Sequence, residues 1–161
     1  MWGVYLKTLF VYCSDDDTIN ALCNESALRK LDTVALELSN CTRKSTFKRY
    51  FGIDRTRRGY YYAGYDVEIE KFDKIIFACD EYMGEIPPEI SAFIRKHELR
   101  YKEIDCIVFG DGKNARKAKD NLRVRVSLSG GTVRNTISVS AKELKREEED
   151  VFFSVRHRLA V

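Results

Sequence analysis

Residues 72–94 read FDKIIFACDEYMGEIPPEISAFI, and this stretch predicts the fold more directly than any other. Lys74 to Cys79 is a short apolar run, typical of a strand that is covered on both faces. Pro87 and Pro88 suit the start of a helix, where proline costs no hydrogen bond, and apolar residues then recur at helical spacing. A strand followed by a helix that packs back on it is half of a βαβ unit, and in such folds ligands bind at the strand–helix turn.

Four more segments read as strands, and helical patterns separate them. The five expected strands are residues Val4–Cys13, Thr33–Leu38, Lys74–Cys79, Ile104–Phe109 and Thr132–Ser140. Strands that alternate with helices need crossover connections, so we expect an α/β domain with a mainly parallel sheet.

Helices are expected after most of these strands. Asp17 or Thr18 is the expected N-cap of the first helix, and Asn114 that of the helix after the fourth strand. Ser45–Phe51 is read as a short helix and Arg55–Tyr65 as a loop. A final helix is expected over Ala141–Leu159, with its KELKREEED run on the solvated face.

The composition predicts one globular domain over residues 1–161, because 44% hydrophobic and 12% aromatic residues are enough for a packed core. A net charge of +3 selects no class of partner. The odd number of cysteines and the absence of CxxC spacing predict reduced thiols in a cytoplasmic protein. No signal peptide and no apolar run of about 20 residues is present, so we expect no membrane association. The five cysteines are Cys13, Cys23, Cys41, Cys79 and Cys106.

With this order of strands and helices, the chain resembles the flavodoxin family. The similarity is best over Phe72–Ile94, where Ala78 to Pro88 match a strand end, an aromatic-Gly turn and a proline-opened helix. Phe109 to Asn114 resembles the family's next loop, and Ser45 to Gly52 the helix after the second strand in shorter relatives. The resemblance implies a three-layer flavodoxin-like sandwich with five parallel strands in the order 2-1-3-4-5 and helices on both faces.

The resemblance also implies a site for flavin mononucleotide (FMN) in the loops that follow the strands. Ser14, Thr18 and Asn20 match the phosphate loop after the first strand. Tyr82 stands where the family has an aromatic residue that stacks on the flavin ring, and Met83 is beside it. The loop after the fourth strand supplies the remaining candidate contacts, from Gly110, Gly112 and Asn114.

The phosphate loop departs from the family because it contains the run Asp15-Asp16-Asp17 and no glycine. A carboxylate about 5 Å from a phosphate charge costs about 3 kcal/mol at an effective dielectric of about 20. A micromolar affinity is worth only about 8 kcal/mol, so two such neighbours would cancel much of it. Asp80, in place of the family's Thr-Pro pair, adds a further acid to the same rim. We therefore expect weak FMN binding or none.

Two other features suggest different ligands. The acidic residues at the expected carboxyl edge of the sheet are ligands that Mg²⁺ or Ca²⁺ would accept, although a solvated acidic rim is the simpler interpretation. The segment Arg43–Tyr62 combines cations with tyrosines and could bind nucleic acid, or be a solvated helix face whose tyrosines cover the sheet edge.

Two functional hypotheses remain open on the sequence alone. In the first, the domain has lost its cofactor and is a non-catalytic binding or interaction module with an unidentified protein partner. In the second, it binds FMN and acts with a redox partner in electron transfer or as a flavodoxin-type oxidoreductase. A redox role requires the flavin, because no side chain here replaces its electron chemistry. Neither the identity of a partner nor the choice between monomer and homodimer follows from the sequence.

Overall fold

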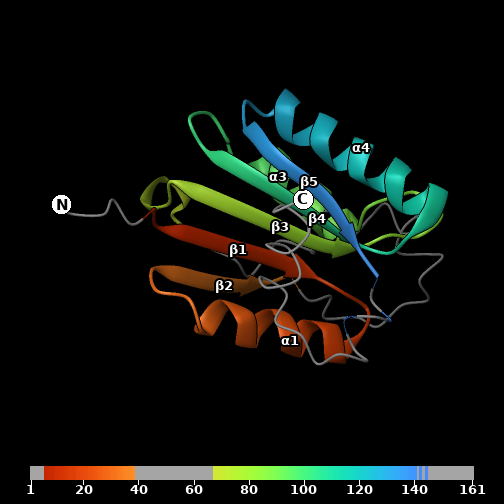
Figure 1. The fold of residues 1–161 in the computed structure, drawn as a ribbon. Coiled ribbons are helices and arrows are strands. Elements are labelled where there is room, and N and C mark those ends of the chain that lie inside the picture. The colour runs from red at the N-terminus through yellow and green to blue at the C-terminus, as the bar shows by residue number, and fades with distance from the viewer. Residues whose placement is uncertain (1–5, 39–66, 141, 143, 145–161) are drawn as a thin grey trace, which may run out of the picture.

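A computed structural model describes residues 6–38, 67–140, 142 and 144. Its centre is a sheet of five parallel strands in the order β2-β1-β3-β4-β5 (Figure 1). The order and the direction of all five strands confirm the expectation from the sequence. The strands are β1 Thr8–Cys13, β2 Thr33–Glu37, β3 Lys74–Asp80, β4 Glu103–Phe109 and β5 Thr132–Val139.

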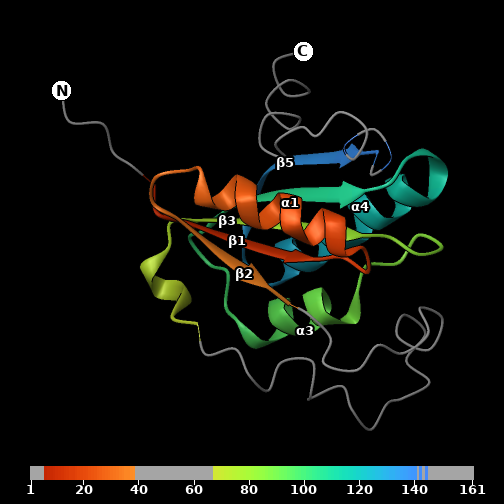
Figure 2. The same cartoon turned by 90° about the horizontal axis from the view of Figure 1, so that it is seen from below.

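In the described residues, three helices and a short 3-10 turn, η3, at Ile69–Lys71 lie between these strands along the chain. Helix α1 spans Asp17–Leu28, α3 spans Pro88–Lys96 and α4 spans Gly112–Leu128. Figure 2 shows α1 and α3 on opposite faces of the sheet, as crossover connections on both sides require. None of the helices in this part of the chain is long and apolar enough to cross a membrane.

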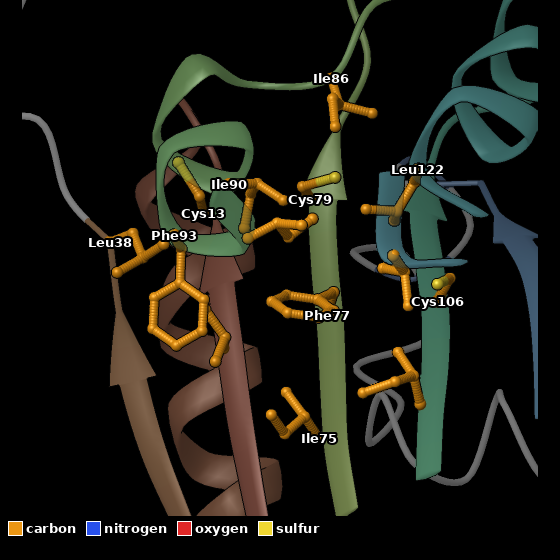
Figure 3. Close-up of a cluster of buried hydrophobic side chains, with 14 of the residues drawn as sticks. Cys13, Leu38, Ile75, Phe77, Cys79, Ile86, Ile90, Phe93, Cys106 and Leu122 are labelled. Atoms are coloured by element: carbon orange, nitrogen blue, oxygen red, sulfur yellow. The ribbon is translucent and has the colours of Figure 1, made fainter. Parts of the chain in front are cut away.

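The larger core lies between the sheet and the helices α3 and α4 (Figure 3). Phe77 of β3 and Phe93 of α3 form its centre, with ring centroids 5.8 Å apart and an edge-on angle of 74°. Both side chains are fully buried. Helix α4 adds apolar residues at helical spacing: Ala115, Ala118, Leu122 and Val126. The expected apolar spacing of both helices is therefore confirmed.

The second core lies on the opposite face, where α1 covers the sheet. Ile19 and Cys23 of α1 are fully buried against Phe10 and Tyr12 of β1, whereas Leu22 is only partly buried. Leu144, in the segment after β5, belongs to the same cluster. The four cysteines in the described part of the chain are buried and free: Cys13, Cys23, Cys79 and Cys106.

Both expected helix caps are wrong. Asp16, and not Asp17 or Thr18, is the N-cap of α1, and its carboxylate accepts a hydrogen bond from the backbone nitrogen of Thr18 at 2.9 Å. Helix α4 already begins at Gly112, so Asn114 lies inside its first turn. The expected helix at Ser45–Phe51, the loop at Arg55–Tyr65, Cys41 and most of the final helix lie outside the described residues.

Candidate functional site

The loop between β1 and α1 is held in shape by Asn20. The side-chain oxygen of Asn20 accepts a hydrogen bond from the backbone nitrogen of Ser14 at 3.0 Å, and its amide nitrogen donates to the Ser14 carbonyl at 2.8 Å. Asn20 is buried, so this pair of bonds forms away from bulk water. Both polar ends of the Asn20 side chain are therefore used inside the loop.

Asp80, the last residue of β3, accepts two further hydrogen bonds from this loop. Its Oδ2 accepts a hydrogen bond from Ser14 Oγ at 2.8 Å and a second from the backbone nitrogen of Asp15, also at 2.8 Å. Ser14 Oγ in turn accepts from the backbone nitrogen of Asp16 at 3.0 Å. A carboxylate therefore stands at the helix N-terminus, in the kind of position where a phosphate oxygen would bind.

The strand register explains why Asp80 reaches this loop. Cys13 of β1 pairs with Cys79 of β3, so the next residues, Ser14 and Asp80, leave the two neighbouring strands side by side. Side chains alternate between the faces of a strand. Asp80 therefore points to the same side of the sheet as Ala78, the side on which α1 packs.

Glu81 points to the other side of the sheet and satisfies a different loop. Its Oε2 accepts a hydrogen bond from the backbone nitrogen of Gly84 at 3.1 Å. The side chain also lies against Gly110, where a Cβ would come within 3.1 Å of Glu81 Cγ. The two acids at the end of β3 thus bind backbone groups on opposite sides of the strand.

The predicted ring-stacking residue Tyr82 begins a tight turn. The backbone groups of Tyr82 and Glu85 exchange two hydrogen bonds of 3.1 and 3.0 Å. Met83 and Gly84, the two central residues, have φ angles of 51° and 83°, the pattern of a type I′ turn. Glycine or asparagine is preferred at both positions, so Met83 stands in a conformation that few side chains adopt. The side chain of Met83 is 58% exposed.

The third loop leads from β4 into α4. Gly110 and Gly112 both have positive φ, and a Cβ on Gly112 would meet no atom within 4 Å. Asn114 is exposed in the first turn of α4. Asp111 precedes the helix as its N-cap, without a side-chain hydrogen bond to it.

The predicted site residues therefore form three groups, each at the carboxyl end of a strand. Ser14 and Asn20 are bonded to each other, while Thr18 is exposed in the first turn of α1. The second group is the turn with Tyr82 and Met83, and the third is the start of α4. Strands β1, β3 and β4 are neighbours, so the three loops lie along one edge of the sheet.

Two buried titratable groups near the loop between β1 and α1, the Cys23 thiol and the Tyr12 hydroxyl, are neutral near neutral pH. Burial, together with the charges of Asp80 and Glu37, raises the pKa of the Cys23 thiol well above its ordinary value. Burial, followed by the charge of Glu37, raises the pKa of Tyr12 to about 12. Neither group is ionised near neutral pH, so Cys23 is not a thiolate nucleophile.

Acidic residues in the described part of the chain act as acceptors for backbone N–H groups. Asp16, Asp80 and Glu81 each accept a hydrogen bond of this kind. Within residues 6–38 and 67–140, no group of three or more His, Cys, Asp or Glu side chains could hold a metal ion.

Two features of the structure differ from what the sequence predicts. The sequence predicts an added acid at Asp80, but the bonds of Asp80 to Ser14 and Asp15 depend on the register of two strands that are 66 residues apart in sequence. The sequence prediction also does not include the cations of α4, although its sequence, GKNARKAKDNLRVRVSL, shows them directly.

No protein-family model matches the sequence, and no curated protein is similar to it in sequence. Solved structures do resemble it. A flavoprotein in complex with FMN from Lactobacillus acidophilus has a TM-score of 0.63 and 14% identity over 90% of this chain and 100% of its own. A Fusobacterium nucleatum flavodoxin bound to FMN has a TM-score of 0.53 and 17% identity over 80% of this chain and 70% of its own.

A short-chain flavodoxin associated with a PDU bacterial microcompartment has a TM-score of 0.51 and 15% identity, over 84% of this chain and 86% of its own. Identities this low establish the architecture alone. Together with the strand order β2-β1-β3-β4-β5 and the helices on both faces, they show that this chain has a flavodoxin-like fold.

Proposed function

We propose that this protein is a flavodoxin-like binding module whose own carboxylate, on Asp80, takes the place of a flavin phosphate. The observation that supports this is the pair of 2.8 Å hydrogen bonds from Ser14 Oγ and the Asp15 nitrogen to Asp80 Oδ2. In this arrangement the loop has an internal anion, and its residues do not fit a second one. The protein would then act through its surface and not through a redox cofactor.

A phosphate bound to this loop would have to displace the Asp80 carboxylate or lie beside it. Hydrogen bonds to charged groups each contribute about 1.5–3 kcal/mol, and a phosphate would have to replace Asp80 at two of them. If the Asp80 carboxylate stayed within about 5 Å of the bound phosphate, the repulsion between the two charges would cost about 3 kcal/mol at an effective dielectric of about 20. Because a micromolar complex is worth only about 8 kcal/mol, either route removes most of the affinity.

The second candidate is an FMN-binding protein that takes part in electron transfer, and two observations favour it. Tyr82 is a partly exposed aromatic residue next to the loops, and the space in front of Gly112 is open. The similar flavoprotein from Lactobacillus acidophilus and the similar flavodoxin from Fusobacterium nucleatum both contain FMN. If FMN is bound, the flavin supplies the electron chemistry, while Tyr82 and the backbone of Gly110 and Gly112 would hold its ring.

A titration of FMN, followed by quenching of its fluorescence, tests the proposal. We expect the wild-type protein to bind more weakly than about 1 mM, and Asp80→Ser to bind at least about tenfold more tightly. Asp111→Asn is the matched control, because it removes an acid from the neighbouring loop that makes no bond to Ser14. Micromolar binding by the wild-type protein would refute the proposal and establish the second candidate.

A double variant distinguishes the effect of Asp80 on FMN binding from the effect of the acids in the loop itself. Asp15→Thr combined with Asp17→Gly removes two charges and leaves the Asp80 carboxylate in place. If Asp80 is the main obstacle, this variant should gain less affinity for FMN than Asp80→Ser does. A larger gain would mean that the charge of the loop, and not the internal carboxylate, excludes the phosphate.

A further inference from the structure

Helix α4 has an unusually basic surface. Its 17 residues include one acid, Asp120, and six cations: Lys113, Arg116, Lys117, Lys119, Arg123 and Arg125. Within the described part of the chain, Lys117 and Arg123 form ion pairs of 3.7 and 4.0 Å, and the other four cations form none. The whole chain has a net charge of only +3, so this helix concentrates positive charge on one part of the surface.

The periodicity of α4 turns most of this charge outward. Ala115, Ala118, Leu122 and Val126 are buried against the sheet, which fixes the inner face of the helix. At 100° per residue, Lys113 and Lys117 lie opposite that inner face together with the acid Asp120, and Arg116 and Arg123 lie to one side of them. Val124 lies on the same outward face and is exposed. Helix α4 thus presents cations together with a smaller apolar area.

The turn with Met83 is fixed against this face. Asn121 of α4 donates a hydrogen bond to the Gly84 carbonyl at 3.0 Å, and Lys117 forms its ion pair with Glu85. A Cβ on Gly84 would meet Lys117 Cδ at 2.5 Å, so the turn and the helix are in close contact. The loop between β3 and α3 lies beside the first turns of α4 in both views (Figures 1 and 2). Met83 is therefore an exposed apolar residue in a turn that contacts Lys117 of α4.

We propose that Met83 and the outward face of α4 form a docking surface for a protein partner that presents acidic side chains around an apolar centre. The charge of α4 selects an acidic partner by complementarity. Met83 supplies the flexible apolar contact that protein interfaces place near their centre. This surface is independent of the phosphate loop, so the inference does not depend on whether Asp80 excludes FMN.

Two other polyanions fit the surface less well. Nucleic acid would neutralise the cations but would leave Met83, which cannot stack on bases, without a function. A lipid surface binds peripheral helices through a continuous apolar face, whereas on the outward face of α4 the apolar Val124 lies among the charged Lys113, Lys117 and Asp120. The backbone of Met83 also favours a specific role. Its left-handed conformation, with φ of 51°, is strained for a residue with a side chain, and strain of this kind is typical of functional sites.

The experiment measures binding to a defined acidic probe. The probe is a short fluorescein-labelled peptide of glutamate and aspartate residues around a central Leu-Phe pair, and binding is followed by anisotropy. We expect the wild-type protein to bind it, with an affinity that falls as salt is added. Lys113→Glu with Arg116→Glu should raise the dissociation constant at least about tenfold. Met83→Asn, which suits the turn, should raise it at least about threefold.

The control variant is Lys7→Glu with Arg29→Glu, which changes the net charge equally on exposed residues outside α4. It should change the affinity by less than about twofold, because Lys7 precedes β1 and Arg29 follows α1, at the amino edge of the sheet, whereas α4 begins at its carboxyl edge. An equal loss in this control would show general charge attraction and overturn the proposal. So would the absence of any binding up to about 1 mM peptide.

Two further probes test the competing partners. A single-stranded RNA oligomer, or vesicles containing phosphatidylserine, would overturn the proposal if they bound through Lys113 and Arg116 and the peptide did not. If Met83→Asn left peptide binding unchanged, the apolar half of the proposed surface would be wrong. None of these outcomes depends on FMN, so they are separate from the test of Asp80.

Discussion

Ser14 and Asp80 are 66 residues apart in the sequence, and their side chains form a 2.8 Å hydrogen bond at the carboxyl edge of the sheet. The hydroxyl of Ser14 donates to Asp80 and accepts from the backbone nitrogen of Asp16. Asp16 in turn caps helix α1. The bond therefore connects the end of β3 to the first turn of α1, and a change at Asp80 should be felt in that helix.

A double-mutant cycle on this pair measures the connection. Asp80→Ala should lower the free energy of unfolding by about 1–2 kcal/mol, because it removes one acceptor from two donors at a half-buried position. With Ser14→Ala, we expect a coupling energy of about 1 kcal/mol from urea denaturation of the single and double variants. Additive losses would show that the bond contributes nothing to stability.

The caps of α1 and α4 give a second prediction. Asp16→Ala should lower the free energy of unfolding by about 1 kcal/mol, since its carboxylate satisfies the Thr18 nitrogen. Asn114→Ala is the matched control and should change it by less than about 0.5 kcal/mol, because Asn114 is exposed inside the first turn. Equal losses in thermal or urea unfolding would contradict the assignment of the caps.

The fold could be predicted because its signals are local. The run Lys74–Cys79 is apolar enough to be a buried parallel strand wherever it pairs, and the structure extends it by only one residue, to Asp80. Ile90 and Phe93 recur at helical spacing, so the packing face of α3 also follows from neighbouring residues. Alternation of such strands and helices leaves few allowed topologies, and the observed strand order is one of them.

The candidate site was harder to predict because its contacts are not local. The sequence placed Ser14 and Tyr82 in the loops that follow β1 and β3, since loops follow from the ends of strands, whereas Asn20 lies in the first turn of α1. It did not predict that Asn20 would bind the backbone of Ser14, because an asparagine in that position could equally face a ligand. The partner of Asp80 depends on strand register, which no single segment encodes.

The buried ion pair between β3 and β4 gives a third prediction. Lys74 Nζ lies 2.6 Å from Asp105 Oδ2, with the two side chains 25% and 8% exposed, and Asn135 donates to Asp105 Oδ1 at 2.8 Å. Lys74→Met should lower the free energy of unfolding by about 3 kcal/mol, because it leaves the Asp105 carboxylate buried without its cation. The measurement is the free energy of unfolding in urea at neutral pH.

The matched variant for this pair replaces both charges. Lys74→Met with Asp105→Leu removes the uncompensated carboxylate and should recover much of the loss, since a buried ion pair is often no more stable than an apolar pair. If the double variant were less stable than Lys74→Met alone, the lysine would not be the main partner of Asp105.

Alkaline pH should destabilise the protein through Tyr12 and Cys106. Burial is the main cause that raises the pKa of both groups, from 10.0 to about 12 for Tyr12 and from 9.0 to about 12 for Cys106. The unfolded chain therefore loses these protons first. The free energy of unfolding is unchanged below about pH 9 and falls as pH rises toward 12, by up to about 1.4 kcal/mol per pH unit for each group.

The variant Tyr12→Phe tests this. Its free energy of unfolding in urea, measured from pH 8 to 11, should decline less steeply above about pH 10 than that of the wild-type protein. An identical slope would mean that Tyr12 ionises as easily in the folded protein as in the unfolded chain.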